Sequence, residues 1–215
     1  MPAAVVFAAS PLRVTARLAD QLARLDKPFV VAADAGAATA LAFGLRPDVV
    51  LGDFDSIDAT ALQRLRASGV SVETFSRDKD FTDGELAILR ALEASPSELL
   101  LLGFVGGPRL DQTLANILQL QRIHVPARMM DERNECRLLR GGEAFTWQPS
   151  SLEVVSLLPL SEPAFGVMTE GLRWRLNDET LHPGDTRGVS NEPVAPTVRV
   201  SLEAGQLLVT RHFPD

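Results

Sequence analysis

The stretch FVVAADAGAATALAFGLRPDVVLGDFDS, residues 29–56, contains the pattern that decides the fold. Two short apolar runs, FVVAA (29–33) and DVVLG (48–52), flank a segment with helical spacing, AATALAFGL (37–45). Apolar runs of this length are typical of strands that are buried on both faces. A strand, a helix and a second strand in this order predict a parallel sheet that is covered by helices.

The same alternation continues on both sides of this stretch, over about the first 130 residues. Ser10 and Pro11 predict the start of a first helix, and Thr82 followed by Glu85 predicts a capping box at a later one. The sequence therefore predicts a Rossmann-like α/β domain over residues 1–130. Its strands are expected at 3–9, 29–33, 48–52, 71–75, 97–105 and 127–130, and its helices at 10–25, 37–45, 58–69, 83–94 and 111–123.

From about Asp131 the helical spacing stops. Short apolar runs then follow one another, and Gly, Pro and Asn-Asp pairs punctuate them. This pattern predicts a second, all-β domain over residues 131–215, a sandwich or a barrel. One of its expected strands, FGVMTEGLRWRL (165–176), includes Trp174, and a tryptophan in a strand usually belongs to the core.

The composition narrows the class of protein. The 215 residues carry a net charge of −7, from 28 acidic and 21 basic residues, which argues against a general nucleic-acid binder. An acidic site can still hold a polyphosphate if a divalent cation lies between them. The single cysteine, Cys136, excludes an internal disulfide and fits a reducing, cytoplasmic location. No apolar stretch approaches the ~20 residues of a membrane span, and the first apolar run lacks the basic flank of a signal peptide.

Polar residues follow four of the predicted parallel strands. Ligands of parallel α/β sheets bind beyond the carboxyl ends of the strands, so these residues are candidates for one site. They are Asp34 and Gly36; Asp53 and Asp55; Asp78, Lys79, Asp80 and Asp83; and Gly106, Gly107, Arg109 and Asp111.

The GDFDS motif allows two interpretations. If the strand stays extended, Asp53 and Asp55 point the same way, and two such carboxylates repel each other unless a cation neutralises them. The alternative is an Asp-rich turn in which Ser56 or Asp58 caps the next helix. The motif by itself does not choose between a metal site and a turn.

Two further motifs have similar alternatives. In RDKDFTDGE (77–85), Asp83 falls in a first helical turn, and Lys79 lies between acids where a metal-bridged polyphosphate would fit. In GGPRLDQTLAN (106–116), paired glycines and Arg109 suit phosphate, while Asp111 is equally expected as a helix cap. Neither a G-x-G-x-x-G fingerprint nor a P-loop is present.

The predicted β domain contributes two candidate regions. Trp174, between Arg173 and Arg175, is either a core residue or a ring that stacks on a flat ligand. Ser190 and Asn191 lie in GVSNE, which is expected to be a loop, and turn chemistry explains them as well as ligand binding does.

Six motifs in order resemble the thiamine pyrophosphokinase family: ADAGA, PDVVLGDFDSI, KDFTD, GGPRLDQTLANI, GLRWRLND and GVSNE. The resemblance covers nearly the whole chain. It implies an α/β domain followed by a β-sandwich domain, and a homodimer with its active site in a cleft between subunits. It also implies Mg²⁺-dependent transfer of a pyrophosphoryl group from ATP to the hydroxyl of thiamine, with release of AMP.

The resemblance also implies roles for individual residues. Asp53, Asp55 and Asp83 match the metal and phosphate acids, with Asp80 as a fourth catalytic acid; either Asp83 or Asp80 accepts the hydroxyl proton. The residues expected to bind ATP and its phosphates are Asp34, Gly36, Lys79, Gly107, Arg109, Asp111 and Asn116. Trp174 matches the ring that packs against thiamine, and Ser190 and Asn191 match its polar contacts.

Three departures from the family pattern accompany these matches. The first strand ends Ala8-Ala9-Ser10 where many members have a glycine, Ala35 stands in a step that is often D-G-G, and Gln112 replaces a frequent histidine. Two other functions therefore stay open: a non-catalytic protein that binds thiamine or a nucleotide, and a Mg²⁺-dependent phosphatase with Asp53 as nucleophile. A glycosyltransferase fits less well, because KDFTD and GVSNE have no role in one.

Overall fold

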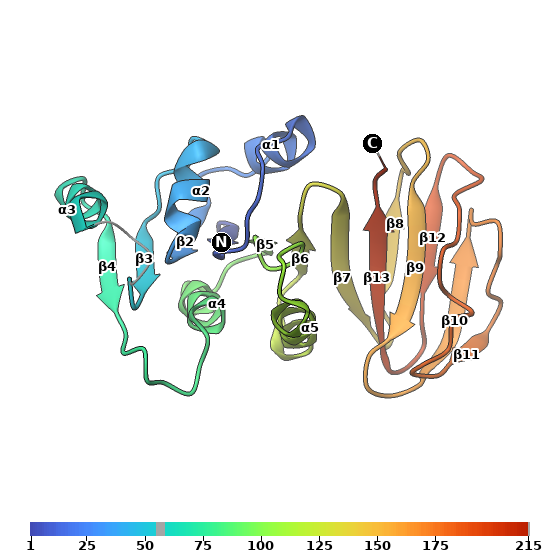
Figure 1. Cartoon of the computed structure of the whole chain (residues 1–215). Coiled ribbons are helices and arrows are strands. Elements are labelled where there is room, and N and C mark those ends of the chain that lie inside the picture. Colours follow the sequence, from blue (N-terminus) through green and yellow to red (C-terminus); the bar gives the residue numbers. More distant parts are fainter. Residues whose placement is uncertain (55–58, 215) are drawn as a thin grey trace. The chain divides into compact units, whose positions relative to one another are not determined.

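The computed structural model describes residues 1–54 and 59–214 and divides into two compact units, Met1–Glu132 and Arg133–Asp215 (Figure 1). We call them unit 1 and unit 2 and describe each by itself. Unit 1 contains α-helices and parallel strands, and unit 2 contains antiparallel strands.

Unit 1 contains a parallel sheet with the strand order β4-β3-β2-β1-β5-β6. Helices pack against it, because strands β1, β2, β3 and β5 are too apolar to face water. The strands are β1 (Ala4–Phe7), β2 (Phe29–Ala33), β3 (Val49–Gly52), β4 (Ser71–Thr74), β5 (Leu99–Leu102) and β6 (Ala127–Met130). The helices are α1 (Ala16–Ala23), α2 (Gly36–Ala42), α3 (Ala59–Ala67), α4 (Asp83–Glu93) and α5 (Leu110–Gln119), followed by the 3₁₀ turn η1 (Leu120–Arg122).

The strand order creates a switch point at the centre of this sheet. The chain moves outward from β1 to β4 and then returns to place β5 on the other side of β1. The carboxyl ends of β1 and β5 are therefore where an open α/β sheet forms its ligand crevice.

Two helix N-caps differ from the sequence prediction. Helix α1 begins at Ala16 instead of near Ser10, because the Thr15 side chain accepts a hydrogen bond from the Leu18 N–H at 3.4 Å and caps the helix there. Helix α5 has Arg109 as its N-cap residue, so Asp111 lies in the first turn and is not the cap.

The capping box of α4 is half formed. Thr82 Oγ1 accepts a hydrogen bond from the Glu85 N–H at 3.1 Å, as predicted. The Glu85 carboxylate does not reach back to the cap; it accepts a hydrogen bond from Arg122 Nη1 at 2.6 Å. An available guanidinium competes successfully with the N-cap backbone N–H for this carboxylate.

Unit 2 consists of antiparallel strands. β13 (Gln206–His212) pairs with both β7 (Asn134–Arg140) and β9 (Val154–Pro159). A second sheet has the order β11-β10-β12-β8, formed by Glu179–Leu181, Ala164–Glu170, Val198–Ser201 and Ala144–Trp147. Buried side chains from both sheets share one core, as in a sandwich: Leu139, Val155, Leu157, Val167, Val198, Val200, Leu207 and Val209.

Trp174 does not lie in a strand, in contrast to the prediction. Strand β10 ends at Glu170, and Trp174 lies in the loop that follows, with 47% of its surface exposed. Gly171 follows the strand with a φ of +76°, and this left-handed conformation ends the extended run.

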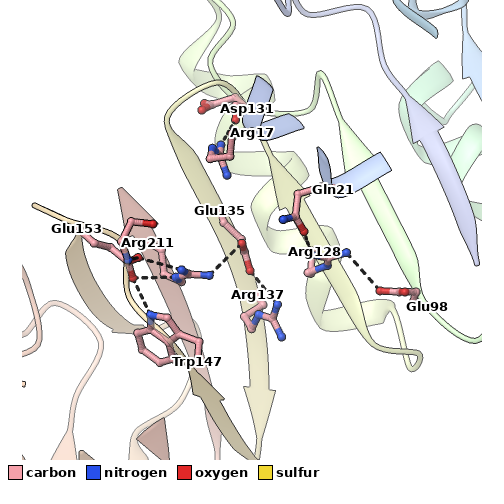
Figure 2. Close-up of polar contacts among 11 residues, drawn as sticks. Arg17, Gln21, Glu98, Arg128, Asp131, Glu135, Arg137, Trp147, Glu153 and Arg211 are labelled. Atoms are coloured by element: carbon pink, nitrogen blue, oxygen red, sulfur yellow. Dashed lines mark hydrogen bonds and ion pairs between the residues drawn. The ribbon is translucent and has the colours of Figure 1, made fainter. Parts of the chain in front are cut away.

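Unit 2 also contains a network of buried charges (Figure 2). Glu153 is 2% exposed and accepts hydrogen bonds from Trp147 Nε1 (2.7 Å), Arg211 Nε (2.8 Å), Arg211 Nη2 (2.9 Å) and Ser150 N (3.0 Å). Arg211 also pairs with Glu135, which pairs with Arg137. Buried carboxylates are stabilised when each oxygen is bonded to donors or cations, as here.

In the part of the chain that the structure describes, no helix is both long enough and apolar enough to cross a bilayer.

Candidate active site

A cavity of about 660 Å³ lies at the carboxyl ends of β1, β2 and β5, at the switch point of unit 1. Its size is within the range of small-ligand sites. Of the residues expected in the site, Asp34, Asp83, Arg109, Asp111 and Asn116 line it. Gly36, Asp53, Lys79, Asp80 and Gly107 are described by the structure but are not part of its lining.

Asp34 determines the conformation of the turn that carries Asp53. Its own φ is +45°, and its Oδ1 accepts a hydrogen bond from the backbone N–H of Phe54 at 3.2 Å. Gly52, with a φ of +150°, packs so closely that a Cβ there would lie 1.9 Å from Asp34 Oδ1. The Asp34 carboxylate therefore occupies the space that a side chain at position 52 would need, and only glycine fits there.

The chain does not stay extended after Gly52. Phe54 has a φ of +57°, so the alternation that would point Asp53 and Asp55 to one side does not continue through Phe54. Asp55 itself lies outside the described residues, as do Ser56 and Asp58, the two expected helix caps.

Asp83 begins helix α4 at the edge of the cavity. Lys79 Nζ lies 3.1 Å from Asp83 Oδ1 and donates a hydrogen bond to the Ser76 carbonyl at 2.9 Å. Asp83 Oδ1 is buried. Its contact with Lys79 is an ion pair without hydrogen-bond geometry, so this oxygen accepts no hydrogen bond from the described residues. The Lys79 ammonium is the counter-ion of this buried oxygen. Asp80 is exposed.

Arg109 and Asp111 form an exposed ion pair beside the cavity. Arg109 Nε donates to Asp111 Oδ1 at 3.2 Å, and Nη2 bonds the second oxygen. This hydrogen bonding lowers the pKa of the Asp111 carboxyl below its ordinary value of 3.8 and raises the pKa of the Arg109 guanidinium. In this arrangement, Asp111 occupies the groups of Arg109 that suit a phosphate.

Asn116 and Gly107 support the loop between β5 and α5. Asn116 Nδ2 donates a hydrogen bond to the Phe104 carbonyl at 2.7 Å, which ties the loop to the helix. A Cβ at Gly107 would lie 2.7 Å from Ser10 Oγ, so Gly107 allows the loop to approach the end of the first strand. At the start of α2, a Cβ at Gly36 would lie 2.3 Å from the Phe7 carbonyl oxygen, so Gly36 allows this helix to approach the end of β1.

Asp131 is a strand-end acid that the sequence reasoning treated only as a domain boundary. It follows β6 directly, is 4% exposed, and its Oδ2 would lie 3.0 Å from a Cβ at Gly106. Its backbone carbonyl accepts a hydrogen bond from Arg17 Nη2 (Figure 2). The strand-end rule that selected the other acids would have selected Asp131 as well.

The three residues expected to contact thiamine lie in two adjoining loops of unit 2. Asn191 Oδ1 accepts a hydrogen bond from the Trp174 N–H at 3.1 Å, which joins the loops. Ser190 is exposed with a φ of +59°, and its backbone N–H donates to Ser156 Oγ at 3.0 Å. Asn191 is 2% exposed, whereas the Trp174 ring is accessible.

The three expected metal ligands, Asp53, Asp55 and Asp83, all belong to unit 1. Among residues 1–54 and 59–214, no group of three or more His, Cys, Asp or Glu side chains is arranged to hold one. Asp55, one of the three expected ligands, is not in that part of the chain. Carboxylate oxygens are nevertheless the donors that Mg²⁺ prefers, and Asp83 Oδ1 is a buried oxygen without a hydrogen bond.

Comparisons with known proteins assign the chain to a family. The profile of the thiamin pyrophosphokinase catalytic domain matches residues 22–130, and that of the thiamin pyrophosphokinase vitamin B1 binding domain matches residues 147–207. Thiamine pyrophosphokinase of Bacillus subtilis is 29% identical over 184 residues, which cover 84% of this chain and 86% of that protein.

Solved structures agree with the assignment. The thiamine pyrophosphokinase of B. subtilis superposes with a TM-score of 0.86 at 24% identity, covering 99% of this chain and 100% of that one. The enzyme of Geobacillus thermodenitrificans gives a TM-score of 0.83 at 26% identity, covering 100% and 99%. The chain belongs to the thiamin pyrophosphokinase family.

Proposed function

We propose that this thiamine pyrophosphokinase binds the polyphosphate of ATP at the strand-end cavity of unit 1 and thiamine at the Trp174 loop of unit 2. The observation that carries the proposal is the cavity itself. It lies at the switch point of a parallel sheet and is lined by the N-terminal turn of α4 and by Arg109. We also propose that unit 1 is Rossmann-like, which its parallel sheet with packed helices supports.

Mg²⁺ is the metal that we propose, with Asp53, Asp55 and Asp83 as its ligands. The ion would neutralise the negative charge that accumulates on the transferring phosphates. Asp34 supports this assignment indirectly, because its bond to the Phe54 N–H fixes the residue next to Asp53.

The chemistry is a displacement at phosphorus. The thiamine hydroxyl oxygen attacks the β-phosphorus of ATP, the bond from that phosphorus to the α,β-bridging oxygen breaks, and AMP leaves with the electron pair. The hydroxyl proton passes to a carboxylate, and Asp83 is favoured over Asp80 because it lines the cavity. The remaining residues position the reactants, which accounts for most of the catalysis in such transfers.

We also propose that the enzyme is a homodimer with its active site between subunits. An exposed apolar stripe on α5 supports an association surface: Leu110, Leu114 and Leu118 recur every four residues and are 72%, 53% and 47% exposed. Sedimentation of wild type and of Leu114→Glu tests this, since a monomeric wild type would contradict it.

The division of labour between the units and the location of the enzyme are further parts of the proposal. Residues 1–130 would bind ATP and Mg²⁺ and add the apolar stripe of α5 to the dimer surface. Residues 131–215 would bind thiamine, in keeping with the matched vitamin B1 binding domain, and form the rest of the dimer surface. A cytoplasmic location fits the single cysteine, Cys136, which is buried and forms no disulfide within the chain.

One assay separates the proposed reaction from its rivals. Incubation with ATP, Mg²⁺ and thiamine should give AMP and thiamine diphosphate in equal amounts. Release of phosphate from phosphoesters without thiamine would indicate the phosphatase, and binding without AMP formation would indicate a non-catalytic protein. Asp53→Asn and Asp55→Asn should abolish turnover with the fold retained, and near-normal AMP release by either variant would contradict the site assignment.

A further inference from the structure

Asn191 lies where two loops and one strand of unit 2 meet. Its backbone N–H and carbonyl both pair with those of Val155 in β9, each at 2.8 Å. The residues after it run beside the Trp174 loop, with hydrogen bonds from Arg173 N to the Glu192 carbonyl and from Val194 N to the Gly171 carbonyl, both at 2.9 Å. The main chain of Asn191 is thus anchored to the core of the sandwich.

The side chain of Asn191 makes its bonds to the backbone next to it. Oδ1 accepts from the N–H of Trp174 (3.1 Å) and from the N–H of Glu192 (2.9 Å), and Nδ2 donates to the Trp174 carbonyl (2.7 Å). Both polar backbone groups of Trp174 are therefore held by one amide, as a neighbouring strand would hold them. Both acceptor positions of Oδ1 are used, and the residue is 2% exposed.

The side chain of Trp174, in contrast to the buried Asn191, is accessible to solvent. It is 47% exposed, and the guanidinium of Arg173 lies over it at 5.6 Å from the ring centroid. Arg173 is in turn fixed by Glu192 at 3.0 Å. An exposed aromatic ring on a backbone that is held at both polar groups is pre-organised for stacking on a flat ligand.

We propose that Asn191 is a positioning residue that fixes the Trp174 backbone for thiamine and does not itself contact the substrate. This rests on the proposed function, in which Trp174 packs against the thiamine ring. It predicts that loss of Asn191 acts on thiamine binding only through Trp174.

A double-mutant cycle tests this directly. Asn191→Ala and Trp174→Ala should each raise the KM for thiamine by about tenfold or more with a smaller change in kcat, and the double variant should resemble Trp174→Ala. If Asn191→Ala raises KM as much in the Trp174→Ala background as in wild type, Asn191 contacts thiamine itself and the proposal is wrong. Thr186→Ala is the matched control, because Thr186 is exposed and its contact to Val189 is through its backbone carbonyl.

A second readout does not depend on activity. In protein labelled with 5-fluorotryptophan, the ¹⁹F signal that disappears in Trp174→Ala belongs to Trp174. Asn191→Ala should shift or broaden that signal while the Trp147 signal stays in place, whereas Thr186→Ala should leave both unchanged. An unchanged Trp174 signal in Asn191→Ala would overturn the positioning role.

These measurements keep the inference separate from the proposed function. If wild type forms no thiamine diphosphate, the proposed function fails and the ¹⁹F comparison alone decides whether Asn191 fixes Trp174. If Asn191→Ala does not fold, Asn191→Asp replaces it: it keeps the acceptor for two N–H groups but faces the Trp174 carbonyl with an oxygen. Its ¹⁹F signal and KM should then change in the same direction, and no change in either would contradict the proposal.

Discussion

Glu153 in unit 2 and Asp83 in unit 1 are carboxylates in contrasting surroundings. Glu153 is almost fully buried and accepts four hydrogen bonds, two of them from Arg211. Asp83 has one ion pair with Lys79, and its buried Oδ1 has no hydrogen bond. A carboxylate whose acceptor positions are all filled by hydrogen bonds stabilises the fold, whereas one that is held by a single ion pair has acceptor capacity left for a ligand.

The largest expected effect is on stability, at Glu153. Glu153→Gln removes one of the two carboxylates that pair with Arg211 and breaks the buried two-oxygen contact between them, so unfolding should become easier by about 3–5 kcal/mol. Urea denaturation measures the loss. The matched control is Glu179→Gln, in the exposed pair with Arg187, which should change stability by less than about 1 kcal/mol. Equal losses in the two variants would show that burial of the network is unimportant.

The opposite result is expected at Asp83. Asp83→Asn keeps the size of the side chain at the helix start but removes the charge beside the cavity, and kcat should fall by about 100-fold or more. The melting temperature should move by only a few degrees. AMP formation and calorimetry on the same preparation check both. A variant that loses stability and keeps its activity would reverse the comparison between Asp83 and Glu153.

An intermediate effect is expected at Gly52, where Asp34 leaves no space for a side chain. Gly52→Ala should destabilise the protein by about 2–3 kcal/mol and reduce turnover, because both the φ of +150° and the contact with Asp34 oppose a Cβ. Gly44→Ala is the control: its φ is +76° and nothing lies within 4 Å of the added Cβ, so only the backbone cost of about 1–2 kcal/mol should appear. Equal denaturation midpoints for both variants would remove the steric role of Asp34.

The smallest effect concerns the exposed pair of Arg109 and Asp111. Because Arg109 lowers the pKa of Asp111, the pair contributes stability that is present above the ordinary value of 3.8 and is lost as the pH falls through the lowered pKa. A ¹³C titration of the Asp111 carboxyl should show that pKa, and Arg109→Gln should return it towards 3.8. Both groups are exposed, so the melting temperature at pH 7 should hardly change. An Asp111 titration that is the same in both proteins would contradict the contact.

The sequence was informative where the physical signal is local. Apolar runs located the core of each parallel strand of unit 1, and β2 and β6 have the predicted bounds. Helix starts were less predictable, since several residues can cap one helix. Thr15 caps α1 in place of Ser10, and the Glu85 carboxylate binds Arg122 instead of the N-cap backbone of α4. The assignment to the family is confirmed, and the roles of the individual site residues stay predictions.

The features that sequence reasoning missed depend on contacts between distant residues. Glu153 and Arg211 are 58 positions apart, and no periodic pattern marks them as partners. The contact of Asp34 with Gly52 and the contact of Asp131 with Gly106 likewise join residues that no sequence pattern marks as partners. Trp174 was expected in a strand that would include residues 165–176, but the strand ends at Glu170, and Gly171 and the bonds to Asn191 hold Trp174 in a loop.

The place of β13 has a consequence for the order in which the chain acquires structure during synthesis. In unit 1 all the parallel strands have been translated once residue 130 is made, so that sheet can assemble while translation continues. In unit 2 the strand between β7 and β9 is β13, and the ribosome adds it after every other strand of that unit. A nascent chain stopped near residue 205 would hold β7 and β9 with nothing between them, and it would expose the apolar faces of both to chaperones and proteases.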